Sequence, residues 1–437
     1  MKPRYKYGFI LLKIMSLEQI LVSERIKNAK KSLEVSLQTY LINRNKAFEN
    51  NDIEKIKKEL KRIKEFSINN LEELKNKTVK NLKEQGIKVF EAKDIEEAKK
   101  IVLDIIPKGE LVVKSKSNAI NEIGLESALK KRNKIIETDC GDFIVQICEE
   151  NSTHPITPAL HIPIEKIIQK INEKFKAKIE KSPEKIIEWI RKYLKKEILK
   201  SKISLTGANV ISSDGGIFIL ENEGNISLIS RLVEKHIIIT GIEKIVPSVQ
   251  DAMFVCQALA IWGSGISLPT YINVISSPSK TADIQKEIVW GAHGPREVYL
   301  ILLDNGRTES IKNGFKEMLY CINCGSCLYF CPVYRQIFDN YGLNYFGGIG
   351  VIKLFFSNGL KKTIEKGLHY CTTCQGCKVN CPLDINVSEL IKKLREVVIE
   401  KGLETENNKK MIENLRAYGN PFGKIEEGKI PKQLYCC

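Results

Sequence analysis

The chain has 437 residues, of which 43% are hydrophobic and 28% charged, which excludes a disordered or collagen-like protein and allows two or three domains. Its 69 basic and 53 acidic residues leave a formal net charge of +16, but both signs alternate along expected helix faces, so nucleic-acid binding is not predicted. Thirteen cysteines are many, and eight of them fall in two short runs. This clustering favours metal or cluster ligation in a reducing compartment over disulfide bonds, so we expect a cytoplasmic protein.

The first residues mimic a signal peptide, but the apolar segment 8–15 is short, is interrupted by Lys13 and lacks a small-residue cleavage site. Met1 and Met15 are therefore alternative starts. No run of about 18 apolar residues occurs in the chain, and no membrane span is expected.

Residues 16–85 are expected to form an N-terminal helical segment. Ile53, Ile56, Leu60 and Ile63 recur at helical spacing, with lysine and glutamate on the other faces. The segment could bind a partner as a coiled structure. A helical cap packed on the following domain is the simpler interpretation.

Residues 86–306 change character, because short β-branched runs now alternate with helical patterns. The apolar run 236–240 is typical of a strand buried on both faces of a parallel sheet. An α/β layered domain is therefore predicted. Its expected strands are 87–90, 111–114, 134–137, 143–147, 203–205, 217–220, 237–240 and 298–303.

Two cysteine runs occupy a helical, loop-rich region over residues 307–400. The run from Cys321 to Cys331 has the pattern C-x2-C-x2-C-x3-C-P, and the run from Cys371 to Cys381 repeats it. In two-cluster ferredoxins a tight loop presents three thiolates to one cluster, and the fourth cysteine ligates the other cluster. The predicted ligands are Cys321, Cys324, Cys327 and Cys381 for one [4Fe–4S] cluster, and Cys371, Cys374, Cys377 and Cys331 for the second.

A pair of structural zinc sites is the alternative, because C-x2-C is also a zinc spacing. Zinc gains nothing from a third cysteine two residues further on, so iron–sulfur clusters are preferred. The remaining residues, 401–437, form a charged tail that ends in Cys436 and Cys437. That vicinal pair could be extra ligands, a redox pair or an end without function.

The other candidate groups are weaker. Cys140, Cys148 and Cys256 have apolar neighbours, as buried unreactive thiols do. His154 and His161 flank a proline-rich loop, but no carboxylate-rich set accompanies them, so a metal pair is not favoured.

Nucleotide motifs are incomplete. Gly263 and Gly265 begin a G-x-G-x-x-G pattern, but it ends in Leu268 and lies outside a βαβ unit. Residues 214–216 are better explained as a hairpin turn between two strands.

Several short segments, taken in order, resemble the LutB-type iron–sulfur proteins of three-component L-lactate utilisation systems. They span most of the chain and lead into the two cysteine runs. They are 113–117, 137–141, 206–209, 222–225, 241–247 and 303–307.

This resemblance implies a lactate-utilisation (LUD) domain with a CoA-transferase-like three-layer α/β/α fold over 86–306, followed by an α-helical ferredoxin module over 307–400. It implies an electron-transfer subunit that works in the oxidation of lactate to pyruvate. It also implies two protein partners, a cysteine-rich redox subunit and a second LUD-family protein.

Two rival functions use the same residues differently. One is a heterodisulfide-reductase-like anaerobic redox subunit with another substrate. The other is a CoA-transferase-like enzyme in which the clusters are structural, and its only glycine-flanked candidate nucleophile is Glu223. A turn residue is the simpler interpretation of Glu223.

Overall fold

The computed structural model describes residues 17–403, 406–426 and 428, so Met1, Met15, Cys436 and Cys437 lie outside the described residues. The described part of the chain begins with four helices, α1 (Leu17–Val22), α2 (Glu24–Glu49), α3 (Ile53–Asn69) and α4 (Leu71–Glu84). Ser23 and Asp52 cap α2 and α3, because their side chains accept hydrogen bonds from backbone amides of the first turn. Helix α2 lies against both following parts of the chain, since Tyr40 contacts Trp262 of one and Ser326 of the other.

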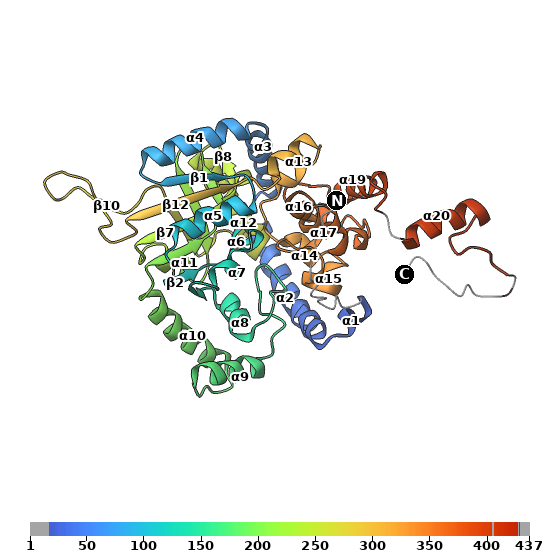
Figure 1. The fold of residues 1–437 in the computed structure, drawn as a ribbon, viewed down its shortest axis with the longest axis horizontal. Coiled ribbons are helices and arrows are strands. Elements are labelled where there is room, and N and C mark those ends of the chain that lie inside the picture. The colour runs from blue at the N-terminus through green and yellow to red at the C-terminus, as the bar shows by residue number, and fades with distance from the viewer. Residues whose placement is uncertain (1–16, 404–405, 427, 429–437) are drawn as a thin grey trace, which may run out of the picture.

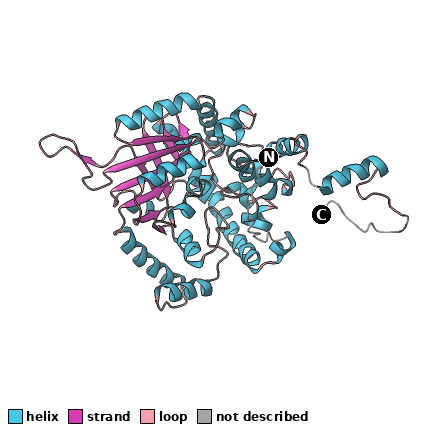
Figure 2. Cartoon of the chain, viewed as in Figure 1, coloured by secondary structure: helices cyan, strands magenta, loops and turns pink. Residues whose placement is uncertain are grey.

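A six-stranded parallel sheet forms the centre of the α/β domain (Figures 1 and 2). Its order is β1-β12-β7-β4-β2-β3. The strands are β1 (Lys88–Ala92), β2 (Leu111–Lys114), β3 (Lys134–Glu137), β4 (Ile203–Thr206), β7 (Lys235–Gly241) and β12 (Glu297–Leu303).

Helices and a second sheet cover the two faces of this sheet, which makes three layers. Ile237 and Ile239 of β7 pack towards α5 (Ile95–Ile105), α6 (Asn118–Glu122) and α7 (Leu125–Leu129). Ile238, between them, packs on the opposite face with α4 and the smaller sheet. Burial on both faces explains why three isoleucines follow one another at the centre of this strand, at residues 237–239.

The smaller sheet has the order β8-β5-β6-β9. Its strands are β5 (Val210–Ser212), β6 (Gly216–Glu221), β8 (Ile245–Val246) and β9 (Tyr271–Ile275). The antiparallel pairing of β5 with β6 confirms the hairpin predicted at residues 214–216. Strands β10 (Lys280–Thr281) and β11 (Val289–Trp290) form a separate hairpin that projects from the domain (Figure 1).

One predicted strand is wrong, because residues 143–147 lie in helix α8 (Cys140–Cys148). Asp139 caps this helix by accepting hydrogen bonds from the amides of Gly141 and Asp142. Its apolar residues Phe143, Ile144 and Ile147 then pack on α9 (Ile164–Phe175) and α10 (Pro183–Ile198). A five-residue apolar run fits either element, and here the cap and the helical packing face decide.

The chain after β12 is helical. The α-helices are α13 (Arg307–Lys312), α14 (Ser326–Tyr329), α15 (Tyr334–Ile337), α16 (Gly347–Asn358), α17 (Leu360–Glu365), α18 (Gly376–Val379), α19 (Val387–Glu400) and α20 (Glu406–Tyr418). The predicted class, an α/β domain with helices before and after it, is confirmed. Within the described residues no helix combines the length and the apolar character needed to cross a membrane.

Candidate iron–sulfur centres and the adjoining cavity

The two cysteine loops have the same backbone conformation. A 3-10 helix precedes each loop, at Lys316–Tyr320 and Leu368–Tyr370, and a short helix follows, α14 or α18. In the first loop the residues on either side of the middle cysteine, Asn323 and Gly325, have φ of 60° and 78°. Their counterparts Thr373 and Gln375 have φ of 55° and 62°. Left-handed backbone is unfavourable for threonine and glutamine, so their use here indicates that cysteine placement dictates the local conformation.

Two small cavities bring the predicted ligands together. Each is lined by three cysteines of one run and the fourth cysteine of the other. The first cavity, about 60 Å³, is lined by Cys321, Cys324, Cys327 and Cys381. The second, about 30 Å³, is lined by Cys371, Cys374, Cys377 and Cys331, and Cys327 reaches it as well.

Backbone amides point at the cysteine sulfurs. The Sγ atoms of Cys321, Cys331 and Cys381 accept hydrogen bonds from amides two or three residues further on, each at 3.4 Å. Pro332 and Pro382 follow two of these cysteines and turn the chain so that the later amides face back to the sulfur. Such N–H···S bonds favour negative charge on sulfur and are one of the factors that set a cluster's reduction potential.

The donor set of both cavities fits an iron–sulfur cluster. Burial, with a smaller contribution from neighbouring thiolates, raises the pKa of Cys331 and Cys377 to about 11 and that of Cys381 to about 12. Thiols gathered in this way are stable as thiolates only next to cationic centres, which cluster irons provide. Zinc needs ligands that converge on one ion, whereas each thiolate of a cubane binds a different iron.

Buried charges lie behind the wall of the first cavity, where they contact the lining residues Asn323 and Tyr345. Lys353 donates to Oδ1 of Asn323 at 2.6 Å and lies over the Tyr345 ring, 4.3 Å from its centroid. Arg307 binds Glu122 at 2.9 Å and also pairs with Glu243. These charged side chains are all under 9% exposed, and burial of this kind requires such pairing.

A larger cavity, of about 330 Å³, lies between the α/β domain and the first cysteine loop. Its walls include the segments directly after β2, β4 and β6 and the end of β7. Residues 322–324 of the first loop close another side. Ligands of open α/β sheets bind at the carboxyl ends of the strands, and this cavity has that position.

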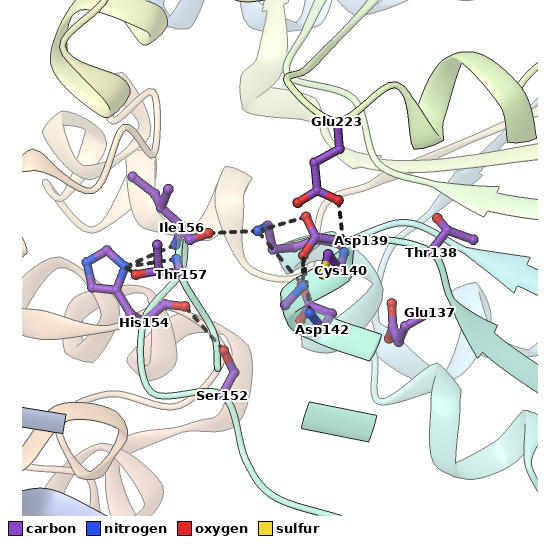
Figure 3. Close-up of polar contacts among 12 residues, drawn as sticks. Glu137, Thr138, Asp139, Cys140, Asp142, Ser152, His154, Ile156, Thr157 and Glu223 are labelled. Atoms are coloured by element: carbon purple, nitrogen blue, oxygen red, sulfur yellow. Dashed lines mark hydrogen bonds and ion pairs between the residues drawn. The ribbon is translucent and has the colours of Figure 1, made fainter. Parts of the chain in front are cut away.

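Glu223 lies at the wall of this cavity, near the N-terminus of α8 (Figure 3). Its Oε2 accepts a hydrogen bond from the backbone amide of Cys140 at 2.9 Å. Lys116, which also lines the cavity, pairs with Asp139 at 3.2 Å and donates to the carbonyl of Ile156 at 3.1 Å. Burial raises the pKa of Glu223, and the nearby carboxylate of Asp139 raises it further.

The remaining histidine and cysteine candidates from the sequence are side chains packed in the protein rather than parts of a reactive site. Nδ1 of His154 accepts hydrogen bonds from the amides of Ile156 and Thr157, each at 3.2 Å (Figure 3). Burial lowers the pKa of His154 to about 3 and that of His161 to about 4, so both are neutral side chains of the core. Burial likewise raises the pKa of the other thiols: to about 12 for Cys140 and Cys256, and to about 11 for Cys148.

Sequence reasoning missed the charged residues around the first loop and the large cavity. Lys353 is thirty residues from Asn323 along the chain, and Arg307 is 185 residues from Glu122. No local spacing marks such contacts. The one signal in the sequence is the apolar surroundings of charged positions, such as Lys353 within the apolar helix α16.

Two family models match separate parts of the chain. The family described as "LUD domain" matches residues 75–303, and the family described as "4Fe-4S dicluster domain" matches residues 317–385. "Lactate utilization protein B" of Bacillus subtilis is 31% identical over 346 residues, which cover 78% of this chain and 70% of that protein. "Uncharacterized electron transport protein YkgF" of Escherichia coli is 29% identical over 364 residues, which cover 82% of this chain and 74% of that protein.

Among solved structures, a DUF162 family protein from Deinococcus radiodurans matches 53% of this chain and 98% of its own length. The sequence identity is 13% and the TM-score is 0.31.

Proposed function

The chain belongs to the LUD-domain family and carries a 4Fe-4S dicluster domain, and from this we propose that it is the iron–sulfur electron-transfer subunit of a multi-subunit system that oxidises L-lactate to pyruvate. The relatives named for lactate utilisation span both parts of the chain and support this substrate. A relative named for electron transport supports the role.

The ligand assignment is part of the proposal. Cys321, Cys324, Cys327 and Cys381 hold one [4Fe–4S] cluster, and Cys371, Cys374, Cys377 and Cys331 hold the second. The single observation that carries it is that each of the two cavities gathers three cysteines of one run with the fourth of the other. The exchange ties the two loops into one unit, because neither loop completes its own donor set.

A [4Fe–4S] cluster supplies one-electron transfer when bound. The residues of this chain hold it and adjust its charge environment. Cys327 lines both cavities, so the two sites adjoin and no large gap separates them.

The proposed partners follow from the chemistry of lactate. Its oxidation removes two electrons and two protons, which normally requires a hydride acceptor or flavin and a base on the hydroxyl. The sequence has no dinucleotide fingerprint. A cysteine-rich redox subunit and a second LUD-family protein are therefore expected to supply the remaining chemistry.

The first test is cluster content. Anaerobically purified protein is expected to contain about eight iron and eight acid-labile sulfide per chain, as two cubanes require. A colourless protein that carries zinc instead would contradict the proposal.

The second test is turnover. The chain alone, free of bound flavin, is expected not to reduce an artificial acceptor with L-lactate, and activity is expected only after the partner subunits are added. Lactate-dependent dye reduction by the single chain would place the reaction in the α/β domain instead.

A further inference from the structure

The cavity of about 330 Å³ has no part in holding the proposed clusters, yet it opens against one of their loops. Its size is at the lower end of the range for sites that bind metabolites and cofactors, about 300–1,000 Å³. Gly207, after β4, lines the cavity where a side chain would not fit: its Cβ would lie 2.5 Å from Oγ of Ser117. Cys324 forms part of the opposite wall.

A buried hydroxyl group in this cavity lacks a partner. Ser115, directly after β2, is 1% exposed and lines the cavity. Its Oγ forms no hydrogen bond with any described residue. Buried hydroxyl groups are nearly always hydrogen-bonded, so an unpaired one on a residue that lines a cavity favours a ligand that supplies the missing partner.

A cation also faces the cavity. Lys244 lines it and, among the described residues, forms no ion pair within 4 Å, because the adjacent carboxylate of Glu243 is taken by Arg307. The buried lysines nearby are engaged: Lys64 donates to the carbonyl of Glu243 and Lys353 to Asn323, each at 2.6 Å. Burial lowers the pKa of Lys244 to about 8, so its amine is still mainly protonated at pH 7. A half-buried ammonium without an ion pair favours an anion.

The carboxylates that line the cavity already have donors. Glu221 accepts from Ser227 and from Asn273, the latter at 2.8 Å. Glu223 accepts from the Cys140 amide. The side of the cavity near Lys244 is therefore the part suited to a negative group, and the acidic side near Glu223 is suited to a hydroxyl or other donor.

We propose that this cavity binds a small organic anion, a carboxylate that carries a further hydrogen-bonding group, with its charge against Lys244 and an oxygen bound by Ser115. The ligand then lies against the loop of Cys324, so its presence is sensed by the first cluster. This last step rests on the proposed function, because it requires Cys324 to be a cluster ligand, whereas binding itself does not.

The experiment uses the cluster-loaded full chain and matched probes. L-lactate, pyruvate and L-malate are titrated by calorimetry beside L-lactamide, which has nearly the shape of lactate without its charge. At least one of the anions is expected to bind, and lactamide is expected to bind roughly tenfold more weakly or not at all, as loss of a charge-assisted hydrogen bond implies. Failure of all three anions, or equal binding of lactate and lactamide, would overturn the inference.

Variants locate the site. Lys244→Met and Ser115→Ala are each expected to weaken anion binding, by roughly tenfold or more for the lysine and less for the serine. Lys192→Met, on the exposed face of α10, is the control and is expected to bind as the unchanged chain does. If both cavity variants bind as tightly as that control, the anion occupies another site and the inference is wrong.

A second measurement separates this inference from the proposed function. Anion binding is expected to change the electron paramagnetic resonance signal of the first cluster and to leave that of the second unchanged. If the chain contains no clusters, the proposed function fails while calorimetry still tests the cavity. If both clusters are present and no anion binds, only the cavity inference fails.

Discussion

The two cysteine loops are alike in backbone and unlike in surroundings. The first is enclosed between the α/β domain and the helical module: a Cβ on Gly263 of α12 (Val249–Ser264) would lie 3.3 Å from the carbonyl oxygen of Cys324. Tyr40 bridges the same region, with its hydroxyl 2.7 Å from the Trp262 carbonyl and 2.8 Å from Oγ of Ser326. The second loop faces outward, where Cys374 is exposed and Val379 is 75% exposed.

This difference shows that one ligand pattern can serve two roles in one chain. Identical spacing produces identical loops, but burial, hydrogen bonds and nearby charges set the reduction potential of each cluster. The enclosed first site adjoins the large cavity. The exposed second site is the one that a protein partner can approach, so electrons are expected to pass between the cavity side and the surface through the pair.

The largest effect is expected from loss of a fourth cysteine, the residue of each run that is proposed to bind the cluster of the other run. Cys381→Ser is expected to perturb the enclosed cluster held by Cys321, Cys324 and Cys327, because the fourth thiolate comes from the other run. Cys331→Ser is expected to perturb the exposed cluster. Electron paramagnetic resonance and iron content of the two variants identify which cluster each loses. If each substitution removed the cluster next to it in sequence, the exchange would be refuted.

Removing a buried arginine should lower the free energy of unfolding more beside the first loop than beside the second. Arg307→Met leaves the buried carboxylates of Glu122 and Glu243 without their cation, and a cost of about 3–5 kcal/mol is expected. Arg395 near the second loop is the matched comparison, since it is half-buried and donates to carbonyls of two described residues, Leu368 at 3.1 Å and Cys371 at 2.7 Å. Arg395→Met is expected to cost about 1–2 kcal/mol.

The measurement is the shift in urea midpoint of the anaerobic, cluster-loaded chain, followed by circular dichroism. Equal shifts for the two arginine variants would show that the charges beside the first loop are not more strongly buried than those beside the second.

The contrast between the loops also explains what could be predicted from sequence. Ligand spacing is local, so the positions from Cys321 to Cys381 are enough to predict two loops. The anion-binding groups are not local: Ser115, Lys244 and Cys324 meet only because strand ends and the helical module face one cavity. The wrong strand at residues 143–147 has a related cause, since a short apolar run does not distinguish a strand from a buried helix.

A single charge near the enclosed cluster should shift the reduction potential of that cluster. Lys353 donates to the side-chain oxygen of Asn323, and the backbone amide of Asn323 donates to Sγ of Cys321 at 3.4 Å. A buried cation stabilises the reduced, more negative cluster, so Lys353→Met is expected to lower the potential of the first cluster. A unit charge about 10 Å away at an effective dielectric constant of about 20 corresponds to about 70 mV.

Redox titration monitored by electron paramagnetic resonance measures this shift. Lys361→Met is the control, because that side chain is exposed on α17 and its charge is screened by solvent. If only the potential of the second cluster shifted, or if both variants shifted the first potential equally, the charge of Lys353 would not be what sets the potential of the first cluster.

The smallest expected effect concerns the second cluster. Ser388, in the first turn of α19, is 2% exposed and lines the second cavity. Its Oγ has no partner among the described residues, although a buried hydroxyl normally has one. With a cluster bound, this hydroxyl can donate to a cluster or cysteine sulfur and stabilise the reduced state.

Ser388→Ala is then expected to lower the reduction potential of the second cluster by about 40 mV, equivalent to about 1 kcal/mol. Ser357→Ala, whose hydroxyl already donates to the Leu354 carbonyl at 3.4 Å, is expected to leave both potentials unchanged. If Ser388→Ala shifted neither potential, or shifted only that of the first cluster, the hydroxyl would have no bond to the second cluster. The difference in exposure would then have to account for any difference between the two reduction potentials.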